Sequence, residues 1–504
     1  MAFPYTIFEE PLLEFRYGQA LEDPHDGLYL FGPYDADLPS HPKKITYGVI
    51  GTENGIALFE RWSEQVLNAP QISEPNKLKL WPPFPGFDVA FDCEWPDKAS
   101  WIYTLDEKEL LEASRHKDEY ARTYEVVNIF MEAFKVLEKR DESFNVIVCI
   151  VPEEIYKNCR PKSRPDDVWG YRPSKKQIDE FKKGQVTLLE DFSDGKHWST
   201  DKYKMSVDFR RQIKARALKY NIPIQIIRET TLSLKNRGDE RRRLTCLSDR
   251  AWNLSTALYY KAGGKPWKLK SAREGVCYIG ISFKRIANTD ERTACCAAQM
   301  FLDSGDGIVF LGDKGPWYSP EKQQFKLSKD AAYNLLSGIL KTYEDLGGQE
   351  LKELFIHCRS HINEEAYEGY KEACPEGVKL VCVRVRKERN DIKLYRPGKM
   401  PIIRGSFLKL NDKTGYLWGT GFKPRLGTYD GWEVPVPLKI HIQYGDSPIE
   451  QVAKDIFSLT KLNYNACKLG DSEPVTIMFS DAVGEILVSN PKIKDRRLQF
   501  KFYI

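Results

Sequence analysis

Short apolar runs and helical stretches alternate in the second half of the chain. The apolar runs are rich in β-branched and aromatic residues, which is typical of buried strands. Between them, apolar residues recur at the spacing of one helix face. The pattern predicts three strands, then a helix, a strand, a helix and a strand. In chain order these elements are residues 276–283, 297–302, 308–311, 328–346, 354–358, 363–373 and 378–385.

The first half carries a different apolar pattern. Residues 144–151 form a continuous apolar run that Pro152 closes, and a helical stretch at 120–139 precedes it. Continuous rather than alternating apolarity favours a parallel strand that is covered on both faces. The segments that follow predict a basic helix, a short strand and a helix that ends at two glycines. These three segments are residues 210–219, 222–227 and 252–264.

The two ends of the chain predict less regular structure. The first 40 residues are rich in Gly, Pro and Asp, which favours strands and turns. Aromatic and polar side chains alternate over 498–504, which predicts a strand that runs to Ile504. We therefore expect the carboxylate of Ile504 to be tucked into the protein.

Composition and charge fit a multidomain protein with local basic surfaces. A length of 504 residues allows two to four domains, and 41% hydrophobic residues argue against long disordered stretches. The net charge is only +4, so a nucleic-acid site would be a local basic channel. Neither an apolar run of about 18 residues nor a secretory signal is present, which predicts a cytoplasmic protein. The 11 cysteines are scattered, which favours reduced thiols over a zinc site.

The predicted order of elements in the second half is that of the RNase H fold. Metal-dependent nucleases on this fold hold two cations with carboxylates, one on the first strand and one after the fourth. Those positions here carry Ser282 and Arg359, and neither is the anionic oxygen ligand that Mg²⁺ prefers. The sequence therefore predicts a nuclease-like domain without catalytic residues, and not an enzyme. A rescued site would have to use the nearby acids Asp303, Asp306 and Glu364.

Several stretches resemble the MID and PIWI domains of Argonautes. They are residues 221–225, residues 253–267 with the sequence Lys-Ala-Gly-Gly-Lys-Pro-Trp at their end, and the strand with Gly280-Ile281-Ser282. Residues 23–34 and 458–465 resemble the short prokaryotic Argonautes. The resemblance implies an α/β protein with two domains and with neither an N nor a PAZ domain. These would be a Rossmann-like MID domain within 1–265 and an RNase H-like, catalytically inactive PIWI domain at 266–504.

The resemblance also implies a pocket for the 5′ phosphate of a guide. The family pattern places it at Arg210, Lys214, Gln225 and Lys261. Lysine and arginine side chains neutralise a terminal phosphate, and residues 210 and 214 share one helix face. Arg210 stands where the family often has tyrosine, which leaves stacking on the first base open. The resemblance further implies a Mg²⁺ at this phosphate, held by Gln225 and the C-terminal carboxylate of Ile504. A solvated basic helix face is the alternative.

Other basic residues suit the backbone of a guide–target duplex. Arg384 and Arg386 alternate on one predicted strand and share a face, and Arg404 lies in a turn rich in Gly and Pro. Such side chains contact phosphates without reading sequence. An ordinary solvated edge is the alternative for each of them.

The function that the resemblance implies is guided recognition without cleavage. A 5′-phosphorylated guide RNA would pair with single-stranded target DNA, and target binding would activate a partner protein that carries an APAZ domain and an effector. Residues 294–300 and 317–318 look most similar to the group with a TIR effector, a NAD hydrolase whose activity depletes NAD in defence against plasmids and phage. A SIR2-APAZ NAD hydrolase or a nuclease effector is the alternative partner. An active guide-directed nuclease and an RNase H-like module without a guide are the rival functions.

Overall fold

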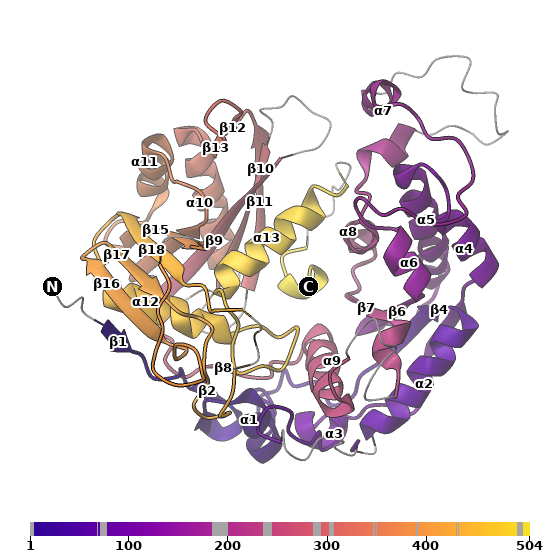
Figure 1. Cartoon of the computed structure of the whole chain (residues 1–504), viewed down its shortest axis with the longest axis horizontal. Helices are drawn as coiled ribbons and strands as arrows, with labels where there is room; N and C mark the ends of the chain where they lie inside the picture. Colours follow the sequence, from indigo (N-terminus) through magenta and orange to yellow (C-terminus); the bar gives the residue numbers. More distant parts are fainter. Residues whose placement is uncertain are drawn as a thin grey trace.

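The computed structural model describes most of the chain as two lobes, each built on its own β-sheet (Figure 1). The residues described are 5–67, 69–70, 78–183, 200–234, 244–285, 294–301, 307–345, 348, 350–389, 392–429, 431, 433–490 and 497–504. The predicted acids Asp303 and Asp306 lie outside them. Within this part of the chain, no helix is long and apolar enough to cross a membrane.

The first lobe is a four-stranded parallel sheet in the order β5-β4-β6-β7. Its strands are β4 (Tyr47–Gly51), β5 (Trp101–Thr104), β6 (Val146–Val151) and β7 (Ile224–Arg228). The larger helices around it are α2 (Glu53–Leu67), α4 (Glu107–Ser114), α5 (Glu119–Leu137), α8 (Phe209–Ala217) and α9 (Leu247–Lys261). Shorter helices are α3 (Phe87–Phe91), α6 (Glu153–Asn158) and α7 (Lys175–Lys182).

Strand β6 shows why the continuous apolar run predicted a buried parallel strand. Its six residues are all buried, and it pairs in parallel with β4 on one side and β7 on the other. Val148 and the residues two positions before and after it pack in one hydrophobic cluster with Trp62 of α2. Cys149 and the residues two positions before and after it pack in a second cluster with Phe130 of α5. The prediction is confirmed, because a strand with helices on both faces has no polar face.

The second lobe is a nine-stranded sheet in the order β1-β16-β17-β18-β15-β14-β9-β10-β11. In chain order its strands are β1 (Tyr5–Ile7), β9 (Val276–Arg285), β10 (Ala294–Phe301), β11 (Gly307–Gly315), β14 (Glu353–Cys358), β15 (Lys379–Lys387), β16 (Ser406–Asn411), β17 (Thr414–Leu417) and β18 (Leu438–Tyr444). Its helices are α10 (Lys329–Asp345), α11 (Glu364–Ala373), α12 (Ile449–Ser458) and α13 (Val475–Leu487). The predicted sequence of strands and helices is confirmed, with one small hairpin, β12 (Tyr318–Ser319) and β13 (Gln324–Phe325), before α10.

The N-terminal region departs from the predicted strands and turns. Residues Pro24–Phe31 form helix α1, because the Asp23 side chain caps it by accepting from the backbone N–H of His25, and a proline stands at its start. Only β1 and the short strands β2 (Leu13–Glu14) and β3 (Ala20–Leu21) are extended, and β3-β2 pairs with β8 (Lys268–Leu269). Strand β1 pairs with β16, so the start of the chain adds a strand to the second lobe.

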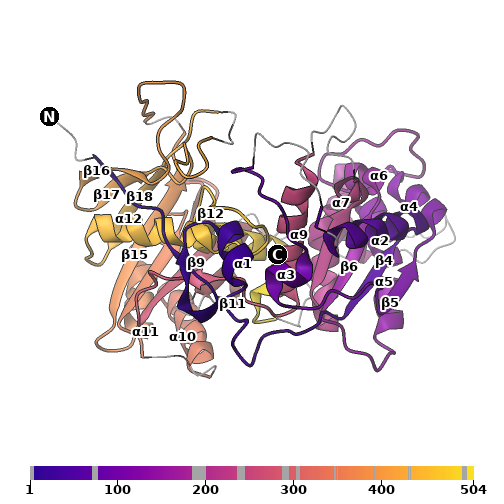
Figure 2. The same ribbon diagram turned by 90° about the horizontal axis from the view of Figure 1, so that it is seen from below.

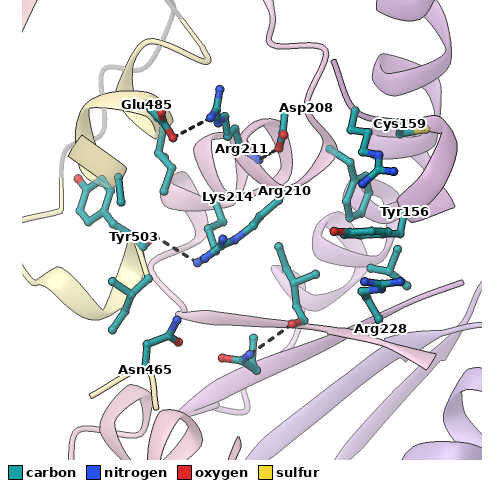
Figure 3. Close-up of a pocket in the computed structure, with 18 residues that line it drawn as sticks. Tyr156, Cys159, Asp208, Arg210, Arg211, Lys214, Arg228, Asn465, Glu485 and Tyr503 are labelled. Atoms are coloured by element: carbon teal, nitrogen blue, oxygen red, sulfur yellow. Dashed lines mark hydrogen bonds and ion pairs between the residues drawn. The ribbon is translucent and has the colours of Figure 1, made fainter. Parts of the chain in front are cut away.

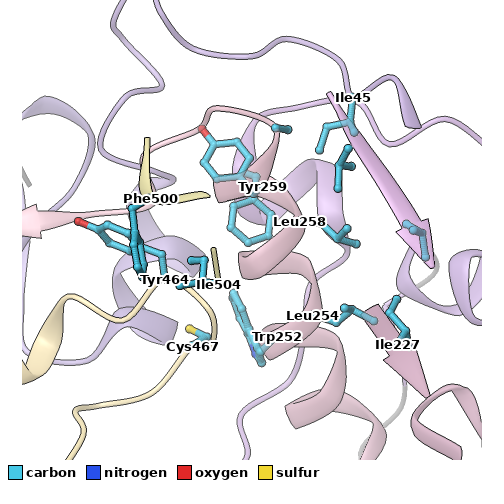
Figure 4. Close-up of a cluster of buried hydrophobic side chains, with 14 of the residues drawn as sticks. Ile45, Ile227, Trp252, Leu254, Leu258, Tyr259, Tyr464, Cys467, Phe500 and Ile504 are labelled. Atoms are coloured by element: carbon cyan, nitrogen blue, oxygen red, sulfur yellow. The ribbon is translucent and has the colours of Figure 1, made fainter. Parts of the chain in front are cut away.

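The C-terminal residues do not form the predicted strand. Residues Phe500–Phe502 are a 3₁₀-helix, and Phe500, Phe502, Tyr503 and Ile504 are all buried. One-sided burial of four of the last five residues does not fit the alternation of a strand. Instead, Phe500 and Ile504 join Trp252 and Leu258 of α9 and Tyr464 in one hydrophobic cluster (Figure 4).

This cluster ties the two lobes together. It contains apolar side chains of β4 and β6 from the first lobe and of α13 from the second. Figures 1 and 2 also show α1 and α3 on the lower side of the molecule, where the two lobes meet. The region where α8, α9, α13 and the C-terminal residues meet is therefore a packed core, and it fixes the position of the side chains described next.

Candidate nucleic-acid interface

A cavity of about 480 Å³ opens between the first lobe and the C-terminal elements of the second (Figure 3). Helix α8 provides one wall, and its start is fixed by Asp208, whose carboxylate accepts from the backbone N–H of Arg211 at 3.0 Å. The residues that line the cavity include Tyr156, Arg210, Arg211, Lys214, Gln225, Arg228, Asn465, Glu485, Tyr503 and Ile504. The carboxyl ends of parallel strands β6 and β7 lie beside it, the common position of ligands in such sheets.

Two buried lysines give this region its charge. Lys214 is only 3% exposed, and its Nζ donates to the backbone oxygen of Tyr503 at 3.2 Å. Burial, followed by the nearby charges of Lys261 and Arg210, holds the pKa of Lys214 well below its usual range. Lys261 is fully buried at the end of α9, and burial together with Arg210 lowers its pKa to about 7.

The Lys261 ammonium has no hydrogen-bond partner among the described residues. The side-chain acids at the cavity are engaged elsewhere, since Asp208 caps α8 and Glu485 forms an ion pair with Arg211 at 2.8 Å. The C-terminal carboxylate of Ile504 also lies at the cavity, but among the described residues it forms no ion pair with Lys214 or Lys261. A buried ammonium without an anion is costly. We therefore expect this site to bind an anionic ligand strongly.

Gln225 and Ile504 complete the predicted set. Gln225 donates through Nε2 to the backbone oxygen of Ile226 at 3.3 Å, while its Oε1 is buried and has no hydrogen-bond partner among the described residues. Ile504 lines the same cavity and is 4% exposed. The structure thus brings Arg210, Lys214, Gln225 and Ile504 into one cavity, with Lys261 within electrostatic reach of it.

An aromatic and cationic pair at this cavity was missed by sequence reasoning. The Arg228 guanidinium carbon lies 3.6 Å from the centre of the Tyr156 ring, and Arg228 is ion-paired with Glu153. Tyr156 is 39% exposed, and the Arg160 guanidinium carbon also lies near its ring, 5.1 Å from the centre. An aromatic ring between two arginines therefore adds positive charge at the edge of the cavity. The available signal was position: Tyr156 follows β6 closely and Arg228 ends β7, the two strand ends beside the cavity.

The two positions predicted to lack the acids of a nuclease lie together in the second lobe. Strands β9 and β14 are parallel with Ile281 opposite Cys358, so Ser282 and Arg359, the next residues, stand side by side. Ser282 is 6% exposed and donates from Oγ to the backbone oxygen of Ser480 at 2.7 Å. Helix α13 lies this close to β9 because Gly280 has no side chain; a Cβ there would overlap the Thr476 carbonyl.

Arg359 is engaged by acids from α13 and the segment before it. Its guanidinium contacts Glu473 Oε1 at 3.0 Å and Asp481 Oδ2 at 3.4 Å. Among the described residues, no group of three or more His, Cys, Asp or Glu side chains could hold a metal ion. Glu364, proposed for a rescued site, is an exposed residue at the start of α11.

The three arginines predicted to contact a nucleic-acid backbone differ. Arg384 and Arg386 share a face of β15 and are partly exposed, and Arg386 pairs with Glu388 at 2.7 Å. Arg404 is instead 3% exposed, pairs with Glu10 at 3.0 Å and donates to Thr460 Oγ1 at 2.7 Å. The prediction for Arg404 is wrong, because its turn packs against Glu10 and Thr460 and hides the side chain from a ligand.

Sequence comparison finds relatives of one kind. No family model matches the chain. The Argonaute protein of Aquifex aeolicus is 26% identical over 314 residues, which are 60% of this chain and 38% of that protein. The Argonaute protein of Thermus thermophilus is 27% identical over 261 residues, 51% of this chain and 33% of that protein. The chain thus matches little more than a third of the length of these curated relatives.

Solved structures show the same fold. Clostridium butyricum Argonaute, solved with a guide DNA and a 19-mer target DNA, has a TM-score of 0.64 at 17% identity, covering 100% of this chain and 55% of that one. Aquifex aeolicus Argonaute has a TM-score of 0.55 at 16% identity, covering 95% of this chain and 52% of that one. Drosophila Piwi has a TM-score of 0.58 at 11% identity, covering 99% and 56%. The fold is therefore that of the MID and PIWI lobes of Argonautes.

Proposed function

We propose that this chain, which curated relatives and a shared fold connect to the Argonaute family, binds a 5′-phosphorylated guide RNA and recognises complementary single-stranded DNA. The observation that carries the proposal is the cavity beside α8, which the buried Lys214 lines with Lys261 within electrostatic reach, and neither lysine has an ion pair with a carboxylate among the described residues.

A terminal phosphate matches this cavity in charge and in donors. It carries up to two negative charges, and Lys214, Lys261 and Arg210 present ammonium and guanidinium donors to one region. A hydroxyl terminus offers no such charge. The pocket would therefore distinguish guides by their 5′ end, and Arg228 and Arg160, held beside the Tyr156 ring, would add cations near the first nucleotide.

A Mg²⁺ at the phosphate fits the residues present. The buried Oε1 of Gln225 is an oxygen without a hydrogen-bond partner among the described residues, and Ile504 lines the same cavity. Gln225 and the carboxylate of Ile504 would hold the ion together with the phosphate, in keeping with the preference of Mg²⁺ for a few oxygen ligands and substrate phosphates. The ion would supply further neutralisation of the phosphate charge.

We further propose that the chain does not cut its target. Ser282 and Arg359 at the two catalytic positions support this, because neither can ligate a cation as a carboxylate does. Target recognition would then act through a partner, by favouring its active state. The partner we favour is a TIR-APAZ NAD hydrolase in a heterodimer that depletes NAD when plasmid or phage DNA is bound; a SIR2-APAZ effector is the alternative.

The decisive experiment compares 5′-phosphorylated and 5′-hydroxyl RNA. The double variant Lys214→Ala, Lys261→Ala should weaken binding of the phosphorylated RNA by about a hundredfold and leave hydroxyl RNA nearly unchanged, because each charged hydrogen bond is worth about 1.5–3 kcal/mol. Fluorescence anisotropy measures both affinities.

The matched control removes two exposed, ion-paired lysines, Lys135→Ala and Lys329→Ala, with the same loss of charge. It should leave both affinities within about twofold. Equal weakening of both RNAs in the Lys214, Lys261 variant would contradict a phosphate pocket.

A further inference from the structure

Seven charged side chains form a chain of ion pairs at the degenerate nuclease position. Lys284 contacts Asp481 at 3.1 Å and Glu485 at 3.5 Å, and Lys387 contacts Glu473 at 3.0 Å. With the two contacts of Arg359 and the Arg211–Glu485 pair, they link α8 of the first lobe to β15 of the second. This charged belt, as we call it, consists of Arg211, Glu485, Lys284, Asp481, Arg359, Glu473 and Lys387.

The belt lies at the carboxyl ends of three adjacent parallel strands. These are β9, β14 and β15, and Lys284, Arg359 and Lys387 stand at or directly after their ends. Such strand ends are where open α/β sheets bind ligands. In metal-dependent nucleases of this fold the same place holds the cations that contact a nucleic-acid phosphate. Here the cationic groups belong to the protein.

The belt has more positive than negative groups. Four cations face three carboxylates, and Arg384 adds a further cation, with its Nε donating to the backbone oxygen of Arg359 at 3.1 Å.

The cations of the belt are held in place and still accessible. Glu473 is 6% exposed and contacts both Arg359 and Lys387, so this buried carboxylate holds the two cationic side chains in position. The Arg359 side chain is 43% exposed and that of Lys387 is 39% exposed. A guanidinium has five N–H donors, so contacts to two carboxylates leave capacity for another anion.

We propose that the charged belt is a phosphate-binding site in which Arg359, with Lys284 and Lys387, takes the place of the metal ions and holds one phosphodiester of the target DNA strand. This inference rests on the proposed function, since it needs a guide to present the target. The site binds the phosphate and breaks no bond. The substitution at position 359 thus adds target affinity as well as removing a catalytic acid.

The test combines a protein change with a change in the DNA. Targets carry a single neutral methylphosphonate linkage, moved one position at a time, and bind to guide-loaded protein. In the unaltered protein, we expect one or two adjacent linkages to weaken binding by roughly tenfold, the loss of one phosphate contact. Arg359→Ala should weaken binding of the all-phosphate target by a similar factor and show no further loss at those linkages.

Arg115→Ala is the matched control, because Arg115 is 40% exposed and pairs with a single acid, Glu154. It should leave the linkage profile unchanged, and Lys387→Ala, a second variant of the belt, should flatten the profile as Arg359→Ala does. Thermal unfolding verifies that each variant is folded.

The outcomes separate this inference from the proposed function. If guide and target bind but the profile of Arg359→Ala and Lys387→Ala equals that of the unaltered protein, the belt does not bind a target phosphate. A second series carries the methylphosphonate in the guide; if a linkage there weakens binding and Arg359→Ala removes that loss, while no target linkage does so, the assignment to the target strand is wrong. If the unaltered protein binds no guide, the proposed function fails and this inference fails with it.

Discussion

Two clusters of buried cations in this protein differ in one respect, the presence of a carboxylate. In the first, Arg404 and Lys461 are almost completely buried, and both contact Glu10, Lys461 at 2.9 Å and Arg404 at 3.0 Å. In the second, Lys214 and Lys261 are equally buried, and neither contacts an acid among the described residues. The two clusters therefore have the same burial, but only the first contains a carboxylate partner among the described residues.

The two clusters also differ in how neighbouring charges shift the pKa values of their buried side chains. Burial lowers the pKa of Lys461 in the first cluster, but the charge of Glu10 opposes this shift. Burial alone would raise the pKa of Glu10, yet Arg404 and Lys461 lower it. Burial and, after it, the charge of the neighbouring Arg210 together lower the pKa of Lys261 to about 7, so here the neighbouring charge adds to the shift instead of opposing it. The first cluster is complete in that one carboxylate of the protein contacts both of its cations, whereas no carboxylate among the described residues contacts the lysines of the second.

This comparison separates structural from functional buried charge. A buried cation with its own carboxylate is expected to hold the fold, because removing either partner leaves an isolated charge. A buried cation without one lowers stability and is a candidate for ligand binding. The charged belt lies between these cases, with internal acids and an excess of cations.

The largest effect is expected from removing the acid of the complete cluster. Glu10→Gln keeps the size of the side chain but leaves Arg404 and Lys461 without their carboxylate, so it should destabilise the protein by about 3–5 kcal/mol. Urea unfolding measures this loss. Glu94→Gln, which breaks the exposed pair with Lys44, is the control and should cost at most about 1 kcal/mol. Equal losses would mean that burial does not distinguish the two pairs.

The second cluster should respond in the opposite direction. Because the pKa of Lys261 is lowered to about 7 in the folded protein, the unfolded chain binds more protons between pH 7 and the usual pKa of lysine. Folding stability contributed by this group therefore rises with pH, by roughly 2 kcal/mol between pH 7 and pH 9. Lys261→Met removes the charge and should make the protein more stable at pH 7.

The check is urea unfolding of the unaltered protein and Lys261→Met at both pH values without nucleic acid. The gain from the substitution should be larger at pH 7 than at pH 9. Lys135→Met, at an exposed ion pair, is the control and should show no such dependence on pH. A variant less stable than the unaltered protein at pH 7 would show that Lys261 has a structural partner.

Local patterns predicted much of the fold. The continuous apolar run of β6 gave a parallel strand because both faces are covered, and the β-β-β-α-β-α-β order gave the core of the second lobe. The predicted order of elements assigned Ser282 to the first strand and Arg359 to the end of the fourth, and the parallel register of β9 and β14 places the two residues side by side. Elements whose burial follows from their own sequence were predictable.

Features that depend on distant residues were not. Arg404 was expected at a surface because its turn is rich in Gly and Pro, but its partner Glu10 lies 394 positions earlier. The C-terminal residues were expected to form a strand, yet the packing of Phe500 and Ile504 against α9 decides their conformation. Likewise, no local pattern connects Tyr156 with Arg228, or Lys284 with Asp481; only the folded sheet brings them together.

The smallest effect concerns the pH dependence of guide binding, which depends on whether the Lys261 side chain is charged or neutral. A bound 5′ phosphate favours the charged ammonium and raises its pKa above the value of about 7 in the free protein. Binding above pH 7 must therefore take up a proton, and affinity for 5′-phosphorylated RNA should fall by up to about tenfold per pH unit between pH 7.5 and 8.5. The phosphate keeps its charge in this range, because its second pKa is about 6.

Anisotropy titrations with 5′-hydroxyl RNA should show no such fall, and Lys261→Met should bind phosphorylated RNA more weakly and with a flatter pH dependence. The same slope for both RNAs would assign the proton to another group and would remove Lys261 from the phosphate site.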